Sequence, residues 1–150
     1  MMQEKSADTI VILVVEDNPG DARLIKEVIN GNKIFCKLYI VSDGVEAMEF
    51  LNNIGKYGDA PRPDLIFLDL NLPRKDGREV LAEIKNDDHL KQIPVVVMTT
   101  SQSEEDILKS YSLHANCYVT KPLDLNQFIA VIKSIEDFWF SLVKLPHIRG

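Results

Sequence analysis

Charged and hydroxyl side chains follow four of the apolar runs in this chain. They are Glu16 and Asp17 after IVILVV, Asp69 after LIFL, Thr99 and Thr100 after IPVVVM, and Lys121 shortly after CYV. A carboxylate at the end of a buried strand is costly to remove from water unless a partner compensates its charge. Carboxylates can hold a hard cation whose remaining water ligands phosphate oxygens can replace. We therefore expect the partners of Asp69 among the other residues of this set.

The charges of this set do not balance by themselves. Glu16, Asp17 and Asp69 carry three negative charges, and Lys121 returns one positive charge. Two like charges about 4 Å apart repel by about 4 kcal/mol at an effective dielectric constant near 20. A divalent ion would neutralise the cluster, and Mg²⁺ (or Mn²⁺) suits a site made of a few carboxylates. The sequence therefore predicts a divalent metal site that includes Asp69.

Each of these residues also has an ordinary structural interpretation. Asp17 and Asp69 could cap the segments that follow them, and Thr99 could be a common strand-end residue. Lys121 stands before a proline, as many solvated turn lysines do. The metal-site hypothesis therefore depends on all four strand ends meeting at one place.

The apolar runs themselves are typical of strands in a parallel sheet. They are short, continuous and rich in β-branched residues, and they cover residues 10–15, 37–41, 65–68, 93–98 and 117–119. Segments with helical apolar spacing lie between and after them. These segments begin at the expected caps Asn18 (before Pro19), Asp43, Asp76, Ser101 and Asp124, of which the last four have Glu or Gln three residues later.

Five strands that alternate with five helices predict one α/β domain. Right-handed crossovers favour a flavodoxin-like, doubly wound five-stranded parallel sheet with strand order 2-1-3-4-5. In that order the first, third, fourth and fifth strands are neighbours. Ligands of such sheets bind outside the carboxyl ends of the strands. The predicted topology would therefore bring Glu16, Asp17, Asp69, Thr99 and Lys121 into one crevice.

Composition limits the class of protein. The chain has 150 residues, of which 45% are hydrophobic and 27% are charged. These values predict a single globular domain over residues 1–150, with a core at about 9–142 and short extensions. The net charge of −6 disfavours nucleic-acid binding. No apolar run approaches the roughly 20 residues of a membrane helix, and the start has no hydrophobic signal core, so we expect a cytoplasmic protein.

Two further features have no clear chemistry. Cys36 and Cys117 lack metal-ligand or CxxC spacing, so we expect reduced thiols. The connection NNIGKYGDAPRP at residues 52–63 is long for such a turn. It could be a surface insertion or a loop that contacts a partner.

The ordered set of motifs resembles the receiver domain of two-component response regulators, from about Ile10 to Phe140. The matching residues are the acidic pair Glu16 and Asp17, Asp69 within FLDLNLPRKDG, Thr99, Tyr118 and Lys121 in the TKP turn. His114 and Cys117 stand where this family often has glycine, and neither position belongs to the chemistry.

The resemblance implies that Asp69 is the phosphoacceptor. Its carboxylate would attack a phosphohistidine of a partner histidine kinase and become an aspartyl phosphate. The metal would be held by Glu16, Asp17, Asp69 and the backbone carbonyl of Asn71. Such a protein catalyses its own phosphorylation and dephosphorylation but is not a turnover enzyme.

The resemblance also implies the groups that stabilise the phosphoryl oxygens. These are the Lys121 ammonium and the Thr99 hydroxyl, with the backbone N–H groups of Asn71 and Thr100 beside them. Movement of Thr99 towards the phosphoryl group would leave space for Tyr118. Phosphorylation would thereby change the face formed by the fourth helix, the fifth strand and the fifth helix.

Within this family the chain is most similar to single-domain regulators that partner phytochrome-type histidine kinases. The stretch IPVVVMTTS, the long 52–63 connection and the tail IEDFWFSLVKLP carry this similarity. Two alternatives stay open, a phosphorelay intermediate that serves a histidine phosphotransfer protein and a phosphorylation-independent interaction module. A dehalogenase-type phosphatase would need an aspartate at Asn71, and the acidic EDNPGD turn would repel a flavin phosphate.

The C-terminal tail predicts a homodimer. A helix from Asp124 to about Leu142 would bury one apolar stripe, formed by Phe128, Ile132, Ile135, Trp139 and Leu142. Ile129, Val131, Phe138 and Phe140 would lie off that stripe, which is more apolar surface than a small monomer usually exposes. Either Leu145 and Pro146 fold back over them, or a second copy covers them through the fourth helix, fifth strand and fifth helix.

Overall fold

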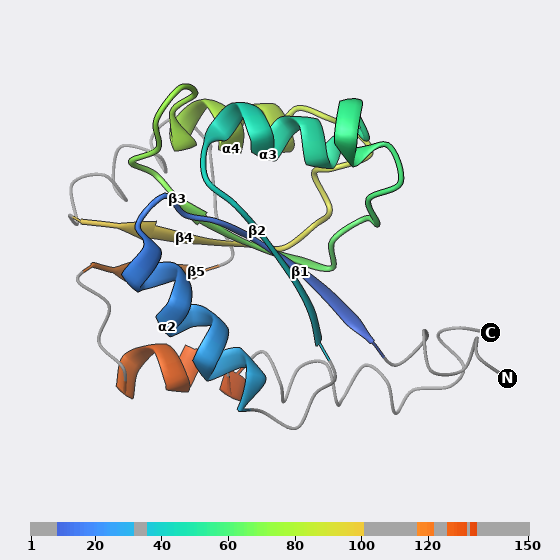
Figure 1. Cartoon of the computed structure of the whole chain (residues 1–150). Helices are drawn as coiled ribbons and strands as arrows, with labels where there is room; N and C mark the ends of the chain where they lie inside the picture. Colours follow the sequence, from blue (N-terminus) through green and yellow to red (C-terminus); the bar gives the residue numbers. More distant parts are fainter. Residues whose placement is uncertain (1–8, 32–35, 101–116, 122–125, 132, 135–150) are drawn as a thin grey trace, which may run out of the picture.

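The protein forms one five-stranded parallel sheet with helices on both faces (Figure 1). The structure is a computed structural model that describes residues 9–31, 36–100, 117–121, 126–131 and 133–134. The strands are β1 (Ile10–Val15), β2 (Cys36–Val41), β3 (Leu65–Asp69), β4 (Val95–Thr99) and β5 (Cys117–Thr120). Their order is β2-β1-β3-β4-β5, and every neighbouring pair is parallel. The predicted fold and strand order are therefore confirmed.

The strand boundaries differ from the predicted ones by one or two residues at five places, and two of these are the ends of β4 and β5, which lie one residue later, at Thr99 and Thr120. β4 begins at Val95 rather than Ile93, since Pro94 has no N–H to donate to a neighbouring strand. β2 begins one residue earlier than expected, at Cys36. β3 extends to Asp69, which is paired in register with Met98 of β4. Asp69 is therefore part of the sheet rather than of the following loop.

The three labelled helices begin where their caps predicted. They are α2 (Pro19–Asn30), α3 (Gly44–Leu51) and α4 (Gly77–Lys85). Asn18 caps α2 by accepting a hydrogen bond from the N–H of Asp21 at 3.0 Å. Asp76 and Glu79 form the complete capping box at the start of α4. Residues 126–131 and 133–134 are also helical, within the segment predicted from Asp124. The predicted helix after β4, with its cap Ser101, and the cap Asp124 itself lie outside the described residues.

The capping box predicted for α3 is only half formed. The Asp43 carboxylate accepts the N–H of Glu46 at 2.7 Å, as expected. The Glu46 carboxylate accepts the N–H of Ser42 instead of that of Asp43, and it also accepts the hydroxyl of Tyr57. The prediction was wrong here because Tyr57, from the 52–63 connection, draws the Glu46 side chain away from its local partner.

The sheet lies between helices on both of its faces (Figure 1), and a layer of buried apolar side chains fills each side. One layer lies under α3 and α4, and alternate strand residues such as Leu13, Ile66 and Val97 point into it. The other layer lies under α2 and the 126–131 helix, where Phe128 is fully buried and its ring lies 5.5 Å from that of Phe67. β3 and β4 are buried at every position because both of their faces are covered.

The long connection between α3 and β3 is folded onto α3. It contains a short 3₁₀ helix, η1 (Gly55–Tyr57), and the Tyr57 ring lies 5.2 Å from the ring of Phe50. The Asn53 amide donates hydrogen bonds to the carbonyl groups of Tyr57 and Ala60. These contacts fix the connection, which the sequence predicted only as a surface insertion or a partner loop. Across the described ranges, no helix is both long enough and apolar enough to span a membrane.

Candidate functional site

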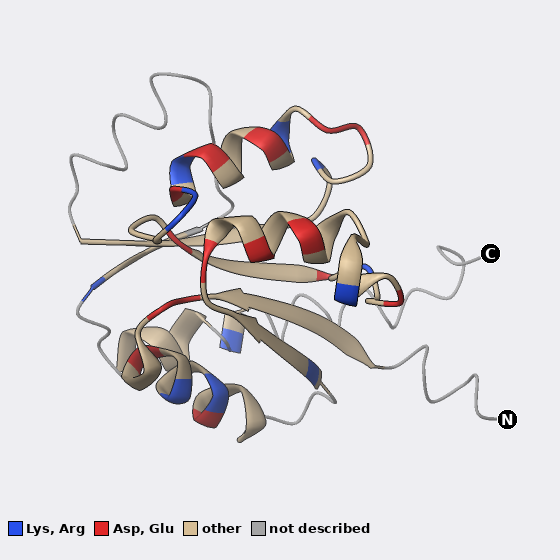
Figure 2. Ribbon diagram, turned by 45° about the horizontal axis from the view of Figure 1, so that its top comes forward, with Lys and Arg blue, Asp and Glu red and all other residues tan. Residues whose placement is uncertain are grey.

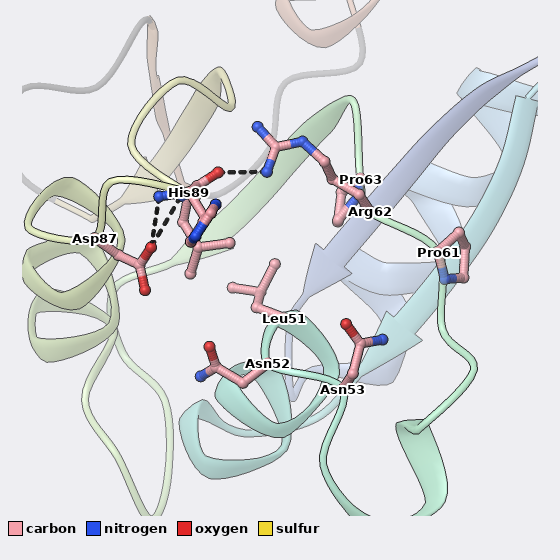
Figure 3. Close-up of a pocket in the computed structure, with 9 residues that line it drawn as sticks. Leu51, Asn52, Asn53, Pro61, Arg62, Pro63, Asp87 and His89 are labelled. Carbon is pink, nitrogen blue, oxygen red and sulfur yellow. Dashed lines mark hydrogen bonds between the residues drawn. The ribbon is translucent and has the colours of Figure 1, made fainter.

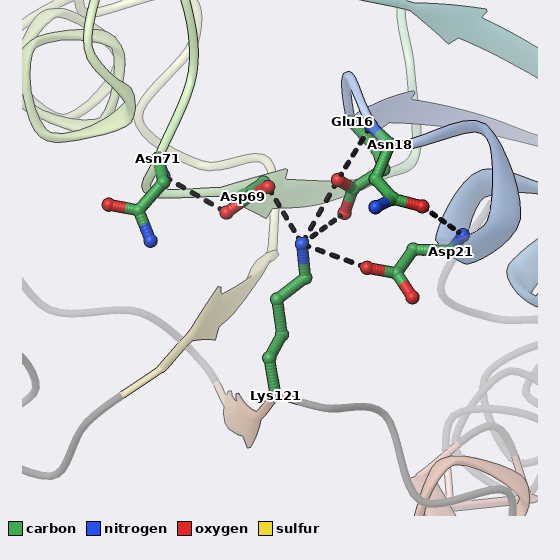
Figure 4. A network of polar contacts seen from close by, with 6 residues as sticks. All are labelled: Glu16, Asn18, Asp21, Asp69, Asn71 and Lys121. Atoms are coloured by element: carbon green, nitrogen blue, oxygen red, sulfur yellow. Dashed lines mark hydrogen bonds and ion pairs between the residues drawn. The ribbon is translucent and has the colours of Figure 1, made fainter.

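Four charged side chains converge at the carboxyl-terminal edge of the sheet (Figure 4). Glu16 follows β1, Asp69 ends β3, Lys121 follows β5, and Asp21 lies in the first turn of α2. The Lys121 Nζ atom lies 2.8 Å from Asp69 Oδ2, 3.0 Å from Glu16 Oε2 and 3.1 Å from Asp21 Oδ2. Figure 2 shows acidic segments gathered at this edge. The predicted convergence of strand ends is therefore present for Glu16, Asp69 and Lys121.

Asp69 is held by both of its carboxylate oxygens. Its Oδ1 atom accepts the backbone N–H of Asn71 at 3.0 Å, and its Oδ2 atom accepts the Lys121 ammonium. Only 1% of Asp69 is exposed. Because β3 is the central strand and is flanked by β1 and β4, the backbone of Asp69 is fixed as well. The structure thus presents one buried, oriented carboxylate at the centre of the site.

Glu16 is buried in a less satisfied environment. Its Oε2 atom accepts the N–H of Asn18 at 3.2 Å as well as Lys121. Its Oε1 atom has no hydrogen-bond partner among the described residues, although it lies 3.0 Å from the Lys121 Nζ atom. Burial, and next the hydrogen bond and charge of Asp69, raise the pKa of Glu16 to about 7, while Lys121 acts in the opposite direction. An additional cation would favour its charged form.

The lysine keeps its charge within this cluster. Burial by itself would lower the pKa of Lys121. The hydrogen bonds and charges of Asp69 and Glu16 outweigh burial and hold that pKa above its ordinary value. Lys121 is therefore a permanent positive charge beside Asp69 at neutral pH.

The acidic residues also fit a divalent cation. Ligand oxygens of Glu16, Asp17 and Asp69 lie within 4.8 Å of one another, with Glu16 and Asp69 buried and Asp17 exposed. The Glu16 Oε1 atom accepts no hydrogen bond from the described residues, so it is a candidate ligand atom. Small divalent cations prefer oxygen ligands of this kind, and an exposed edge lets the ion keep some water. The donor set therefore matches the predicted metal site.

The other predicted site residues surround this cluster. Thr99 is buried at the end of β4, and its carbonyl accepts the backbone N–H of Lys121 at 2.7 Å. Thr100 is exposed. Tyr118 is half-buried on β5, opposite Val97 of β4, and packs against the apolar layer under α3 and α4. The structure thus ties Thr99 to Lys121 through the backbone.

Asp21 is the member of the cluster that sequence reasoning missed. It stands in the quoted stretch EDNPGD, but it was not assigned to the site because it does not end a strand. The available signal was its place in the first turn of a helix that begins directly after Glu16 and Asp17. That turn lies beside the carboxyl end of β1, so a side chain there can reach the site.

The loop after Asp69 is packed against two glycines. A Cβ atom on Gly77 would lie 2.3 Å from the Asp69 carbonyl oxygen, and one on Gly44 would lie 2.0 Å from the Lys75 carbonyl oxygen. Arg74, in the same loop, has a φ of 66° and pairs with the Asp43 carboxylate at 3.1 Å. These close contacts link the backbone of Asp69 to the starts of both α3 and α4.

A pocket of about 310 Å³ lies away from this site (Figure 3). Its lining comes from the end of α3, the 61–63 segment and the turn after α4. The Asp87 carboxylate accepts the N–H groups of His89 and Leu90, and the Arg62 guanidinium donates to the His89 carbonyl. These polar groups serve local structure, and none belongs to the acidic cluster.

The raised pKa of Glu16 predicts an unusual pH dependence of stability. Between its ordinary pKa of 4.5 and about 7, the folded protein binds more protons at Glu16 than the unfolded chain does. The free energy of unfolding therefore falls as pH rises through this window, by up to about 3 kcal/mol from this group. Mg²⁺ should offset the loss, since it favours the charged carboxylate.

Urea unfolding of the wild type and of Glu16→Gln, at pH 5 and pH 8, would measure this effect. The free energy of unfolding of the wild type, minus that of Glu16→Gln, should be larger at pH 5 than at pH 8. Added Mg²⁺ should stabilise the wild type more at pH 8. An equal difference at both pH values would show that Glu16 keeps an ordinary pKa.

Comparisons with known proteins agree with this geometry. Residues 12–133 match the family described as the response regulator receiver domain. The response regulator Rcp1 of Synechocystis sp. is 52% identical over 145 residues, which are 97% of this chain and 99% of Rcp1. The structure of the phosphorylated cyanobacterial phytochrome response regulator RcpA shares 54% identity and a TM-score of 0.77, covering 89% of this chain and 96% of that one. The Mn²⁺-bound form of Rcp1 shares 54% identity and a TM-score of 0.76, covering 87% and 94%.

Proposed function

Since the chain belongs to the response regulator receiver domain family, we propose that it takes a phosphoryl group onto Asp69 from a phytochrome-type histidine kinase in a Mg²⁺-dependent reaction. The family assignment agrees with the resemblance inferred from the motifs. The observation that carries the proposal is the buried Asp69 carboxylate at the end of the central strand, 2.8 Å from the Lys121 ammonium. The phytochrome response regulators among the similar structures support this class of kinase. We also propose a cytoplasmic location, where a kinase of this class would reach the protein.

The chain's own residues would hold the metal and orient the acceptor. Glu16, Asp17 and Asp69 are the proposed ligands, together with the backbone carbonyl of Asn71. The Mn²⁺-bound structure of Rcp1 supports a divalent ion in this kind of protein. When bound, Mg²⁺ would neutralise part of the negative charge of the transferring group. Asn71 and Lys121 would keep the Asp69 carboxylate oriented, as they do in this structure.

The transfer itself needs little covalent work from the protein. A carboxylate oxygen of Asp69 attacks the phosphorus of the kinase phosphohistidine, and a P–O bond forms while the P–N bond breaks. The electron pair stays on the imidazole, which takes up a proton. The Lys121 ammonium and the Thr99 hydroxyl stabilise the negative phosphoryl oxygens, with the N–H groups of Asn71 and Thr100 beside them. Hydrolysis of the acyl phosphate returns Asp69, so the chain catalyses its own dephosphorylation without turning over a substrate.

Phosphorylation would reach the protein surface through β4 and β5. Thr99 and Tyr118 lie on these paired strands, and Tyr118 packs against the layer under α3 and α4. We assign Thr99 and Tyr118 as the switch pair on the face that includes β5. A phosphorelay intermediate would have the same site and would differ in passing the group to a histidine phosphotransfer protein. The complete set of acidic residues and lysine disfavours a module that works without phosphorylation.

Chemical phosphorylation tests this function directly. Incubation with acetyl phosphate and Mg²⁺ should add the mass of one phosphoryl group to the intact protein, and EDTA should prevent the addition. Transfer from a labelled phytochrome-type kinase, followed by addition of a histidine phosphotransfer protein, would separate an end-point regulator from a relay intermediate. Absence of labelling under all of these conditions would contradict the proposal.

We also propose a homodimer through the face that contains β5 and the C-terminal helix. Ile129 on this helix is 43% exposed, as the helical spacing predicted. Val131, which was predicted to lie off the core stripe as well, is instead half-buried and packs against the apolar layer under α2. Phe138 and Phe140 lie outside the described residues. Sedimentation over a range of concentrations should show a dimer in the micromolar range that Ile129→Asp or Phe138→Asp weakens by tenfold or more. A strict monomer at high micromolar concentration, with and without beryllofluoride, would contradict this assembly.

A further inference from the structure

The Lys121 ammonium has three carboxylate neighbours, one for each of its N–H donors (Figure 4). It donates hydrogen bonds to Glu16 and Asp69 and pairs with Asp21 at 3.1 Å. A lysine in this state has no donor left for a phosphoryl oxygen. We propose that Asp21 is a positioning residue that competes with the phosphoryl group for Lys121 and so sets how tightly the site holds that group. This inference rests on the proposed function of Asp69 and Lys121.

Asp21 is the partner that Lys121 can leave at the smallest cost. The side chains of Glu16 and Asp69 are 0% and 2% exposed, whereas that of Asp21 is 27% exposed. A buried carboxylate that loses its lysine has no water to replace it, so its loss is costly. Water can solvate Asp21 when the ammonium moves away. The Lys121 ammonium should therefore leave Asp21 and bind a phosphoryl oxygen instead, while it stays beside Asp69.

The fold holds Asp21 within reach of the lysine. Its backbone N–H donates to the Asn18 side chain at 3.0 Å, which fixes the first turn of α2 beside the end of β1. A negative charge in the first turn of a helix is also favourable by itself. Asp21 therefore does not need Lys121 to stay in place. It remains close to the site after the lysine has moved, as a negative charge near the phosphoryl oxygens.

This arrangement predicts opposite effects on the two ligands of the site. For a phosphoryl group, Asp21 is both a competitor for Lys121 and a repelling charge, so it weakens binding. For a divalent cation alone, Asp21 adds negative charge beside the ligand carboxylates and offsets part of the Lys121 charge, so it strengthens binding. Replacing a residue that only supports the fold would instead weaken the binding of both the phosphoryl group and the cation.

Asp21→Asn is the variant that tests the inference, because it removes the charge and retains a similar shape. Mg²⁺ alone should bind about two- to fivefold more weakly, as measured by titration. Beryllofluoride, at saturating Mg²⁺, should bind about two- to tenfold more tightly than to the wild type. Asp21→Glu, which restores a carboxylate, should return both affinities towards the wild-type values.

Glu27→Gln is the matched control. Glu27 lies on the same helix, carries the same charge and pairs with Arg23 at 2.9 Å rather than with Lys121. Loss of the Glu27 charge should change neither the Mg²⁺ affinity nor the beryllofluoride affinity by more than about 1.5-fold. The inference is overturned if Asp21→Asn leaves both affinities unchanged, moves them in the same direction, or is reproduced by Glu27→Gln. If the wild type itself does not bind beryllofluoride, the proposed function fails as well.

Discussion

Replacing Asp69 by asparagine is expected to abolish phosphorylation by acetyl phosphate and Mg²⁺. The amide has almost the same shape, but it lacks the negative oxygen that attacks phosphorus and removes one of the proposed metal ligands. Among the carboxylates of the cluster, Asp69 is the one that ends the central strand and contacts both Asn71 and Lys121. Intact-mass measurement should show one phosphoryl group on the wild type and none on Asp69→Asn.

Asp64→Asn provides the matched control for this experiment. Asp64 directly precedes β3, at the opposite end from Asp69, and its carboxylate accepts the N–H of Val11 at 2.9 Å. An asparagine oxygen can accept the same hydrogen bond, so this variant should be phosphorylated like the wild type. Equal labelling of Asp69→Asn and the wild type would show that another residue is the acceptor.

The Asp69 variant should also be more stable than the wild type without metal. The hydrogen bond and charge of Asp69 both raise the pKa of Glu16, so their loss lets Glu16 ionise more easily. Lys121 would then balance two carboxylates instead of three. We expect the free energy of unfolding at pH 8 to rise by about 1–2 kcal/mol. The same substitution would thus abolish phosphorylation and relieve the repulsion among the carboxylates of the site.

Replacing Gly77 by alanine is expected to cause a large loss of stability. The added methyl group would lie 2.3 Å from the Asp69 carbonyl oxygen and 2.6 Å from the Leu70 Cα atom. These are backbone atoms of the central strand and its exit, and they cannot turn aside as a side chain can. We expect the free energy of unfolding to fall by about 3 kcal/mol or more. Because Asp69 must shift, Mg²⁺ binding should weaken as well.

Gly31→Ala is the control for Gly77→Ala. Gly31 has a φ of −83°, and a Cβ atom there would meet its nearest neighbour at 3.5 Å, which is an ordinary contact. The free energy of unfolding of Gly31→Ala, measured with urea, should therefore differ from that of the wild type by less than about 0.5 kcal/mol. If both alanine variants unfold at the wild-type urea concentration, the close packing at Gly77 is not needed to hold Asp69.

The sequence by itself determined the fold and most of the acidic cluster. Strands and helix starts are encoded within a few neighbouring residues, as the cap Asn18 and the box of Asp76 with Glu79 show. Parallel strands bring their carboxyl ends to one edge. Once the strand order was predicted, Glu16, Asp69 and Lys121 had to lie near one another, although Lys121 is 105 and 52 positions away from the other two.

Only the tertiary structure decided which groups touch. Asp21 reaches Lys121 because α2 leaves β1 at a particular angle, and no local pattern records that angle. Glu46 does not complete its capping box because its carboxylate accepts the Ser42 N–H and the hydroxyl of Tyr57, which the next connection folds back onto α3. Periodicity and caps depend on neighbours in the chain, whereas these contacts depend on how packed elements face one another. The sequence therefore determined where the charges gather, and the packing decided which partners each charge has.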